Sequence, residues 1–401
     1  MKRKCTMLIL LIVILLITTG CWNRRELNEL AITMALGIDL TKDGKYVVTA
    51  QVVNPGEVAG KSSGATGSSP VIIFQETGKT IFEAIRKMTN SSPRSIYPSH
   101  LRMLVIGESL AKEGIGKPLD LLSRDWELRS DFFIVVAKGR NAEDILKIPT
   151  SLEKIPANKL FDALEVSEKA WAASSGYTLD ELIKDMISDG KQPVLTGVRA
   201  ELKGDKTSLA KQNVEMIDPH GRLYYQDLAV FDGEHLIGWL DEKQSRTYNA
   251  ITNKVKSTVV NVKCPKGGNF VYQIIKSHAE VKGKIKNGEP KIDIKIRAEG
   301  NVGEIECNVE LTKSESIAKL EKMIEKQSDA MFTKAVQQIQ ENKKVDIFGF
   351  GEVLHRADPK AWKTLKNDWD QKFEDLPVNI KVQAEIKRVG TVGNSFLEKI
   401  K

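Results

Sequence analysis

The sequence predicts a multidomain α+β protein, with mixed sheets flanked by helices, behind an N-terminal lipoprotein signal peptide. Three observations support this prediction. A chain of 401 residues is longer than one hydrophobic core usually holds, strand-like and helix-like stretches alternate without repeats, and Cys21 follows a short apolar segment. After a signal peptide at 1–20 we expect three domains. They are an N-terminal α+β domain at 21–190, a strand-rich middle domain at 191–270 and a C-terminal α+β domain at 271–401.

The first residues have the pattern of a bacterial lipoprotein signal. Three basic residues at positions 2–4 precede an uncharged apolar run at 6–17, and the small pair Thr19-Gly20 stands before Cys21. Such a run is too short for a stable membrane helix, and small residues mark a cleavage site. We predict that the mature chain begins at Cys21, which carries diacylglyceryl and N-acyl lipid. Three places before the cysteine, where lipoprotein signals usually have an apolar residue, this chain has Thr18. An ordinary signal peptide or an uncleaved anchor is therefore the alternative.

Charge and lipid together predict where the chain works. Cleavage would remove Lys2, Arg3 and Lys4, so the formal charge would fall from +7 to +4 over the remaining 381 residues. Basic and acidic residues are interspersed, which indicates a solvated surface and argues against a nucleic-acid partner. Two acyl chains hold a protein stably on a bilayer. We therefore expect an exported body on the outer face of a membrane.

Four cysteines are too few for a disulfide scaffold. Cys5 lies in the signal and Cys21 would be acylated, so only Cys264 and Cys307 could pair. Both lie in strand-like segments. We favour two separate buried thiols, with a bridge as the alternative.

The N-terminal domain is expected to open with a hairpin. Strands at 31–40 and 45–53 flank the turn Lys42-Asp43-Gly44, and a mobile Gly/Ser-rich loop follows at 54–70. Part of that loop resembles a phosphate-binding motif, but Gly56 and Gly60 have three residues between them instead of four, and no helix follows. Nucleotide binding is therefore not expected. Further elements follow in order: a helix at 78–88, a strand at 101–106, a helix at 119–128, a strand at 132–137, and helices near 141–147 and 178–188.

Beyond Gly190 the pattern turns to strands. We predict them at 194–202, 224–231, 257–264, 270–275, 279–286, 291–298 and 304–311. A long helix at 313–342 follows, with Thr312 and Glu315 as a capping box. Its apolar stripe is one-sided, so it should pack on the preceding strands, with a partner-helix interface as the alternative.

The search for catalytic chemistry is mostly negative. The five histidines are dispersed without metal-ligand spacing, no Gly-x-Ser-x-Gly motif occurs, and Gly349-Phe350-Gly351 lacks the third glycine of a dinucleotide loop. Because Asp and Glu are abundant, the sequence does not exclude a pair of carboxylates for glycoside hydrolysis. We predict a noncatalytic protein without metal or cofactor.

Several short segments together resemble one family. They are Cys21-Trp22-Asn23-Arg24-Arg25-Glu26-Leu27; Ser92-Pro93-Arg94 with His100-Leu101-Arg102; Leu228-Ala229-Val230-Phe231 with Leu236-Ile237-Gly238-Trp239-Leu240; Asp346-Ile347-Phe348-Gly349-Phe350-Gly351 with Leu354-His355-Arg356; and Ile386-Lys387-Arg388-Val389-Gly390. In order and spacing they resemble the Ger(x)C lipoproteins, the C subunits of spore germinant receptors.

The resemblance implies a lipid-anchored, three-domain α+β protein on the outer face of the inner spore membrane. Its partners would be a membrane-embedded A subunit and a transporter-like B subunit, in a complex that senses small nutrients. Whether this subunit binds the nutrient is left open. The alternative from another class is a solute-binding lipoprotein that feeds a transporter, which predicts two similar doubly wound lobes around a cleft.

Six residues are candidate membrane or partner contacts. Beside the lipid site, the aromatic and charged side chains suit a membrane interface or a partner's loop, and a plain tether is the alternative. The other two candidates, Arg94 and His100, flank a Pro-bounded turn, and their side chains either contact a partner or bond the loop's own carbonyls. The six are Trp22, Arg24, Arg25, Glu26, Arg94 and His100. We also expect Asp346–Arg356 to form a close backbone turn, and Trp362 and Trp369 to lie on one helix in the core.

Overall fold

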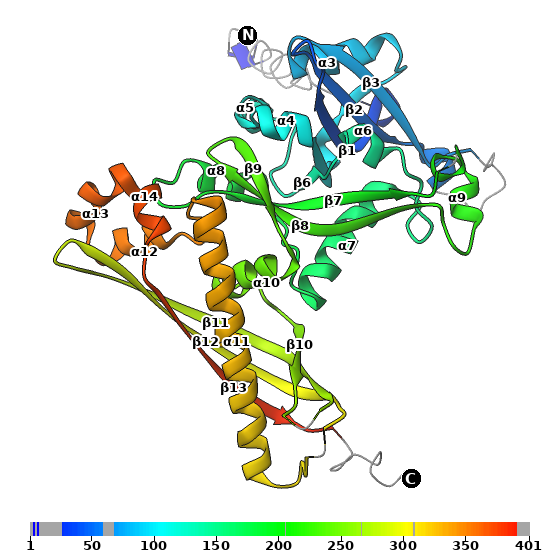
Figure 1. Cartoon of the computed structure of the whole chain (residues 1–401). Coiled ribbons are helices and arrows are strands. Elements are labelled where there is room, and N and C mark those ends of the chain that lie inside the picture. Colours follow the sequence, from blue (N-terminus) through cyan, green and yellow to red (C-terminus); the bar gives the residue numbers. More distant parts are fainter. Residues whose placement is uncertain are drawn as a thin grey trace.

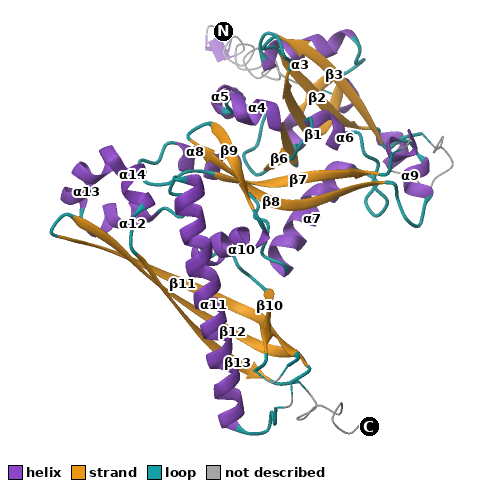
Figure 2. Ribbon diagram, in the orientation of Figure 1, coloured by secondary structure: helices purple, strands orange, loops and turns teal. Residues whose placement is uncertain are grey.

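A computed structural model shows two lobes joined by a packed junction (Figures 1 and 2). It describes residues 3–4, 6–7, 26–58, 68–204, 206–265, 267–307 and 309–390. The strands are β1 Leu30–Leu40, β2 Tyr46–Val53, β3 Val71–Gly78, β4 Ser95–Tyr97, β5 Met103–Gly107, β6 Phe133–Ala137, β7 Val194–Leu202, β8 Gly221–Asp232, β9 His235–Leu240, β10 Thr258–Lys263, β11 Asn269–Lys286, β12 Glu289–Ile305 and β13 Val378–Arg388.

The helices range from four residues in α2 to 30 residues in α11. They are α2 Pro55–Val58, α3 Ile81–Lys87, α4 Glu108–Glu113, α5 Gly116–Arg124, α6 Ala142–Leu146, α7 Pro156–Ala170, α8 Leu179–Met186, α9 Gln212–Glu215, α10 Glu242–Ile251, α11 Ser314–Lys343, α12 Phe350–Ala357, α13 Pro359–Leu365 and α14 Trp369–Glu374. Single-turn 3-10 segments are η1 Leu27–Glu29, η2 Met88–Asn90, η3 Pro98–His100, η4 Lys206–Leu209 and η5 Lys366–Asp368.

The first lobe is built on a nine-stranded mixed sheet. Its order is β3-β2-β1-β5-β6-β7-β8-β9, with β4 paired to the start of β1. The centre, β1-β5-β6-β7, is parallel, and antiparallel hairpins extend both sides. Because β6 and β7 pair in this sheet, it spans the domain boundary that the sequence placed at residue 190.

Helices cover both faces of the first sheet, which explains its apolar centre. Along β5, Leu104 and Ile106 face the core formed with α3, α4, α5 and α8, whereas Met103 and Val105 face the core formed with α6 and α7. All five residues of β5 are buried. A strand buried on both faces reads as a continuous apolar run, as this one does.

The second lobe is a four-stranded sheet with one long helix. Its order is β10-β11-β12-β13, and α11 packs on one face through residues such as Leu320 and Ile324. In β12 buried residues alternate with exposed or half-buried ones, many of them charged, along the opposite face. Figure 1 shows α11 crossing this sheet, with α12, α13 and α14 at its upper end.

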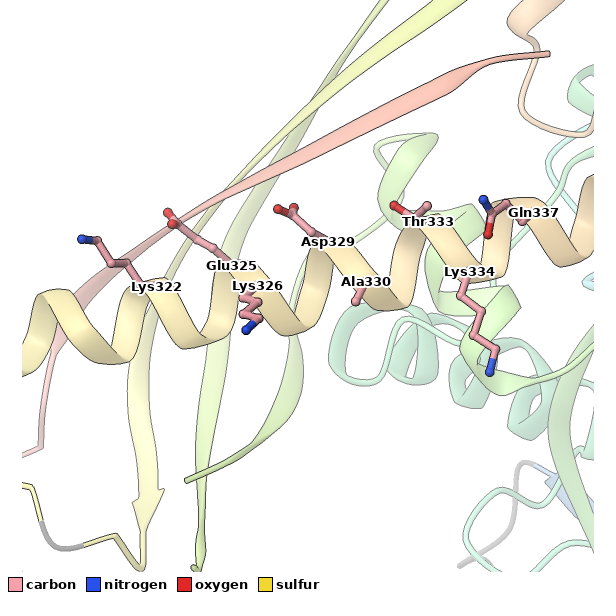
Figure 3. A pocket seen from close by; sticks show the side chains of 8 residues that line it. All are labelled: Lys322, Glu325, Lys326, Asp329, Ala330, Thr333, Lys334 and Gln337. Atoms are coloured by element: carbon pink, nitrogen blue, oxygen red, sulfur yellow. The ribbon is translucent and has the colours of Figure 1, made fainter. Parts of the chain in front are cut away.

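Side chains of α11 cover the free edge of β13. Alternate backbone N–H groups of this strand donate to three carboxylates that are spaced four residues apart on the helix. The pairs are Val382 with Asp329 at 2.7 Å, Ala384 with Glu325 at 3.1 Å and Ile386 with Glu321 at 2.8 Å. Figure 3 shows Glu325 and Asp329 projecting on the β13 side of α11. The helix thus satisfies donors that an edge strand would otherwise expose.

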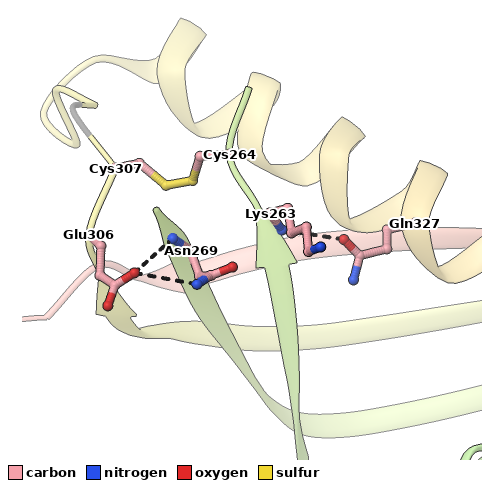
Figure 4. The surroundings of a disulfide bond; sticks show 6 residues. All are labelled: Lys263, Cys264, Asn269, Glu306, Cys307 and Gln327. Carbon is pink, nitrogen blue, oxygen red and sulfur yellow. Dashed lines mark hydrogen bonds between the residues drawn. A yellow bond between two sulfur atoms is a disulfide. The ribbon is translucent and has the colours of Figure 1, made fainter. Parts of the chain in front are cut away.

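A disulfide joins Cys264 and Cys307, so the favoured prediction of two separate thiols is wrong (Figure 4). Cys264 directly follows β10, Cys307 lies two residues after the end of β12, and both strands pair with β11. This register brings the two Cα atoms to 6.1 Å although 43 positions separate the residues in sequence. The pairing depended on strand order, which the spacing of the cysteines does not reveal.

Most predicted elements are present, with shifted ends. The first hairpin, the helix at 78–88 and the long helix are confirmed. The strands at 270–275 and 279–286 are one strand, β11, and the strand at 304–311 is wrong because β12 ends at Ile305. The elements that the sequence analysis did not predict include the strands β3, β9 and β13 and the helices α4, α7 and α10.

Three local predictions need correction. Part of the loop at 54–70 is a short helix, α2, and residues 59–67 lie outside the described chain, so their predicted mobility is untested. The capping box of Thr312 and Glu315 is wrong, because α11 begins after Lys313 without a side-chain cap. Trp362 and Trp369 are buried as expected but lie on two helices, α13 and α14.

Within the described ranges, no helix combines the length and apolar character needed to cross a membrane.

Candidate functional site

The predicted lipid site and three of its neighbours, Cys21, Trp22, Arg24 and Arg25, lie outside the described residues. Glu26 is described and exposed, and its backbone N–H donates to the Glu29 carboxylate at 3.3 Å, which closes the turn of η1. Only residues 22–29 separate Cys21 from the first strand. An attachment at Cys21 would therefore hold the first lobe close to the membrane.

Arg94 lies beside the start of the first strand, because β4 pairs Ser95 with Leu30. The loop is held by serine hydroxyls: Ser92 bonds the backbone N–H and C=O of Arg94, and Ser99 donates to the Glu127 carbonyl at 2.6 Å. The side chains of Arg94 and His100 form no hydrogen bond with the described residues, so they do not bond the loop's carbonyls there. His100 is exposed, and its ring meets Tyr97 edge-on at 6.3 Å. Partner contact by Arg94 and His100 stays a prediction.

The segment 346–351 forms the junction between the lobes. The Asp346 carboxylate is fully buried and accepts the N–H groups of Phe348, Gly349 and Gly351 and the indole N–H of Trp369, at 2.8–3.1 Å. Burial raises the pKa of Asp346 to about 6, although these donors favour the ionised form. The expected backbone turn is confirmed, with Gly349 at φ 76°.

Close backbone approach tightens this junction. A Cβ on Gly190, which precedes β7, would lie 2.7 Å from the backbone of Gly351, and a Cβ on Gly351 would lie 2.6 Å from Trp362. The backbone N–H of Gln192 donates to the Asp346 carbonyl at 2.7 Å, and Ser188 donates to Glu352 at 2.9 Å. The two glycines thus permit contacts that a larger residue would block.

A buried polar cluster lies beside the junction. The hydroxyls of Tyr177 and Tyr248 are 2.5 Å apart, and Lys191 pairs with Asp185 at 2.7 Å. The Lys254 ammonium lies 3.4 Å from the centre of the Tyr177 ring, and burial lowers the pKa of Lys254 to about 8. Because these residues come from α8, α10 and the segments beside them, the cluster ties the first lobe to α10, which leads into the second.

At the carboxyl ends of the parallel strands, the place where doubly wound domains bind ligands, the chain fills the space itself. The Asp39 carboxylate accepts the N–H groups of Ala142 and Glu143 at 2.7 and 3.1 Å, and burial raises the pKa of Asp39. A Cβ on Gly107 would lie 1.9 Å from Asp39 Oδ1. The first N–H groups of α6 are therefore bonded by a carboxylate of the chain itself.

No group of three His, Cys, Asp or Glu among the described residues could hold a metal ion. The lobes also differ in architecture, one with nine strands and helices on both faces, the other with four strands and a single long helix. The similar doubly wound lobes expected of a solute-binding lipoprotein are not found in the described chain.

Comparisons with known proteins identify the family. Residues 23–200 match the family described as "Spore germination protein N-terminal domain", and residues 226–390 match "Spore germination B3/ GerAC like, C-terminal". "Spore germination protein KC" of Bacillus subtilis (strain 168) is 33% identical over 407 residues, covering 100% of both chains. The chain belongs to the Ger(x)C family of spore germination proteins.

Other comparisons agree with this assignment. "Spore germination protein B3" of Bacillus subtilis (strain 168) is 25% identical and covers 94% of this chain and 96% of the relative. "Crystal Structure of the GerBC protein" matches with a TM-score of 0.54 and 19% identity, over 88% of this chain and 96% of that one. The second likeness shows a shared Ger(x)C fold.

The sequence and the structure locate different features of this Ger(x)C chain. The motif at 346–351 was found from sequence and proves to build the junction. Asp185, Lys191 and Tyr248 were missed, since single polar residues far apart in sequence give no pattern. Asp39 had one signal, an acidic residue inside an otherwise apolar strand.

Proposed function

We propose that this chain is a noncatalytic, lipid-anchored subunit of a nutrient germinant receptor, required for spore germination. It would work with membrane-embedded A and B subunits on the outer face of the cell membrane, which in the spore is the inner spore membrane. The observation that carries this proposal is the similarity over 100% of both chains to a spore germination protein. The lipoprotein pattern at Cys21 supports the anchor.

Two structural features support an exported assembly subunit. The Cys264–Cys307 disulfide suits a compartment outside the cytoplasm, where such bonds persist. The junction at Asp346 holds two unlike lobes in a fixed relation, as a subunit that holds membrane partners together requires. Both features are compatible with a noncatalytic role.

The test is nutrient-triggered germination of spores that carry Cys21→Ala, with Cys5→Ala as the matched control inside the signal. Membrane amounts of this protein and of the A and B subunits are measured in the same spores, together with incorporation of labelled palmitate. We expect Cys21→Ala alone to lose the label, the membrane-bound protein and the response. A normal response with normal membrane retention would contradict the proposal.

A further inference from the structure

The long helix α11 has two chemically different sides. Apolar residues on one side pack on the second sheet, and the carboxylates of Glu321, Glu325 and Asp329 accept backbone N–H groups of β13. The side that faces away from the sheet carries lysines, because positions three or four residues apart lie on one side of a helix. The four lysines are all exposed, and they are Lys319, Lys322, Lys326 and Lys334.

These four lysines have no counter-charge within the described chain. None of them forms an ion pair or a side-chain hydrogen bond with another described residue. Between Lys319 and Lys334 the helix has three carboxylates, and all three are bonded to β13. Lysines three or four positions apart on a helix repel one another, so the row costs stability unless negative charge lies beside it.

The residues outside the described ranges do not supply this negative charge either. Their sequence contains only two acidic side chains, Asp205 and Glu398. Asp205 follows β7 of the first lobe, and Glu398 is accompanied by two lysines, Lys399 and Lys401. Negative charge that balances the row on α11 therefore has to come from outside these 401 residues.

The lysine side of α11 also has the shape of a helix-packing site (Figure 3). An open groove of about 570 Å³ is lined by two rows of side chains, each with a spacing of four positions. One row is Lys322, Lys326, Ala330 and Lys334, and the other is Glu325, Asp329, Thr333 and Gln337. Rows of this spacing form the ridges and grooves through which two helices pack. The short side chain of Ala330 lets a second helix approach the middle of the groove.

The composition of this side favours a polypeptide over a bilayer surface. Helices that lie on a membrane insert Trp, Phe or Leu side chains below the lipid headgroups. Over its 30 described residues, α11 exposes no large apolar side chain. Its exposed side therefore offers charge and a groove, but nothing that inserts into lipid.

We propose that the lysine side of α11 binds a helix of another polypeptide whose contact face is acidic. The carboxylates of that helix would face the lysine row. Uncharged side chains would lie against Glu325 and Asp329, because these carboxylates already bond β13 and would repel further acids. This names a docking surface for a partner subunit, and so rests on the proposed assembly function.

A second copy of this chain fits the surface poorly. Two α11 helices packed together would bring their lysine rows into contact, and like charges oppose such an association. Apart from α11, the longest described helix is α7, with 15 residues. Two of its three carboxylates are already paired, Glu165 with Lys169 and Glu168 with Lys256, both at 3.0 Å. It therefore offers no acidic row.

The test uses the full-length chain in spores, with a photoreactive amino acid at Ala330 in the groove and, as control, at the exposed Ser123 on α5 of the first lobe. Adducts are identified by mass spectrometry. We expect the probe at Ala330, and not at Ser123, to reach a segment of another polypeptide in which Asp or Glu recurs every three or four positions. An adduct with lipid or with a second copy, or no adduct at normal membrane abundance, would overturn the proposal.

Paired substitutions test whether charge holds the partner. Lys326→Glu with Lys334→Glu should reduce the Ala330 adduct about tenfold, because each change replaces an attraction by a repulsion. Lys326→Arg with Lys334→Arg keeps the charge and should keep the adduct. Lys360→Glu with Lys363→Glu, a matched reversal of exposed lysines at α13, should leave it unchanged. Isolated membranes irradiated in about 1 M salt, which screens exposed charges beyond about 3 Å, should also lose it.

Membrane abundance of each variant separates the possible failures. If the protein stays in the membrane with the A and B subunits but the Ala330 adduct survives the Lys326 and Lys334 reversal, this docking surface is wrong and the assembly function stands. If the unaltered chain is absent from the membrane, the proposed function itself is wrong.

Discussion

The two lobes stabilise their sheets in different ways. In the first lobe, helices on both faces bury the central strands completely, as all five residues of β5 show. In the second lobe, α11 covers one face, while the other presents charged residues such as Lys295 and Arg297. A sheet with one wet face buries less apolar surface per strand. The stability of the second sheet then depends more on contacts at its edges and on the Cys264–Cys307 disulfide.

The junction decides whether these two regions behave as one unit. Asp346 is the centre of that junction, because one carboxylate bonds the turn before α12 and the indole of Trp369. Each prediction below tests either this joint or the different sources of stability on its two sides.

The largest effect is expected from Asp346→Ala. The change leaves four buried N–H groups without an acceptor, and each unsatisfied group costs about 1–3 kcal/mol. Since part of this cost is relieved by local relaxation, we expect a loss of about 4 kcal/mol and two separate unfolding transitions in calorimetry. Asp358→Ala removes a helix cap that is less buried, and should cost only about 1 kcal/mol. Equal losses would contradict a special role for the junction.

Removing the disulfide should weaken the second lobe alone. Replacing both Cys264 and Cys307 by Ser releases a bridge across 43 positions, which is worth about 3–4 kcal/mol in the chain-entropy account. Hydrogen exchange should quicken in β10, β11 and β12 and stay unchanged in β5. Faster exchange in both lobes would show that they unfold together.

The junction should lose stability as pH rises from about 4 to about 6. The pKa of Asp346 is raised from 3.8 to about 6 in the folded protein, so over that window the folded state holds a proton that the unfolded state has released. The expected fall in the free energy of unfolding is about 2–3 kcal/mol, by the relation of 1.36 kcal/mol for each pKa unit. Unfolding measured from pH 4 to 7 checks this. Asp346→Asn should remove this part of the pH dependence, and an unchanged profile in that variant would refute the assignment.

The smallest effect is expected at the edge of β13. Glu325→Ala frees the Ala384 N–H and should cost about 1–2 kcal/mol. Lys326→Ala is the matched control, because Figure 3 shows that Lys326 projects away from β13. Exchange of the Ala384 amide should quicken only in the Glu325 variant. No difference between the two would show that the helix carboxylates do not protect this edge.

Sequence patterns found elements wherever periodicity was strong. The apolar stripe predicted α11, and alternation predicted the first hairpin and most second-lobe strands. β3 was missed because it begins directly after a Gly/Ser-rich segment. β13 was missed because only its last residues, 386–388, were noted, as part of the family motif at 386–390. Boundaries within the second sheet failed where β11 continues through a register shift near Ile274.

The sequence by itself determined the family, the α+β class, the lipoprotein pattern at Cys21 and the turn at 346–351, because each depends on residues that are close together in the sequence. Only the tertiary structure decided the disulfide, the carboxylates that cover β13 and the junction around Asp346. These depend on residues tens to more than a hundred positions apart, and no local pattern fixes which of them meet. Strand order and register bring them together, and both follow from how the whole chain packs its apolar surface.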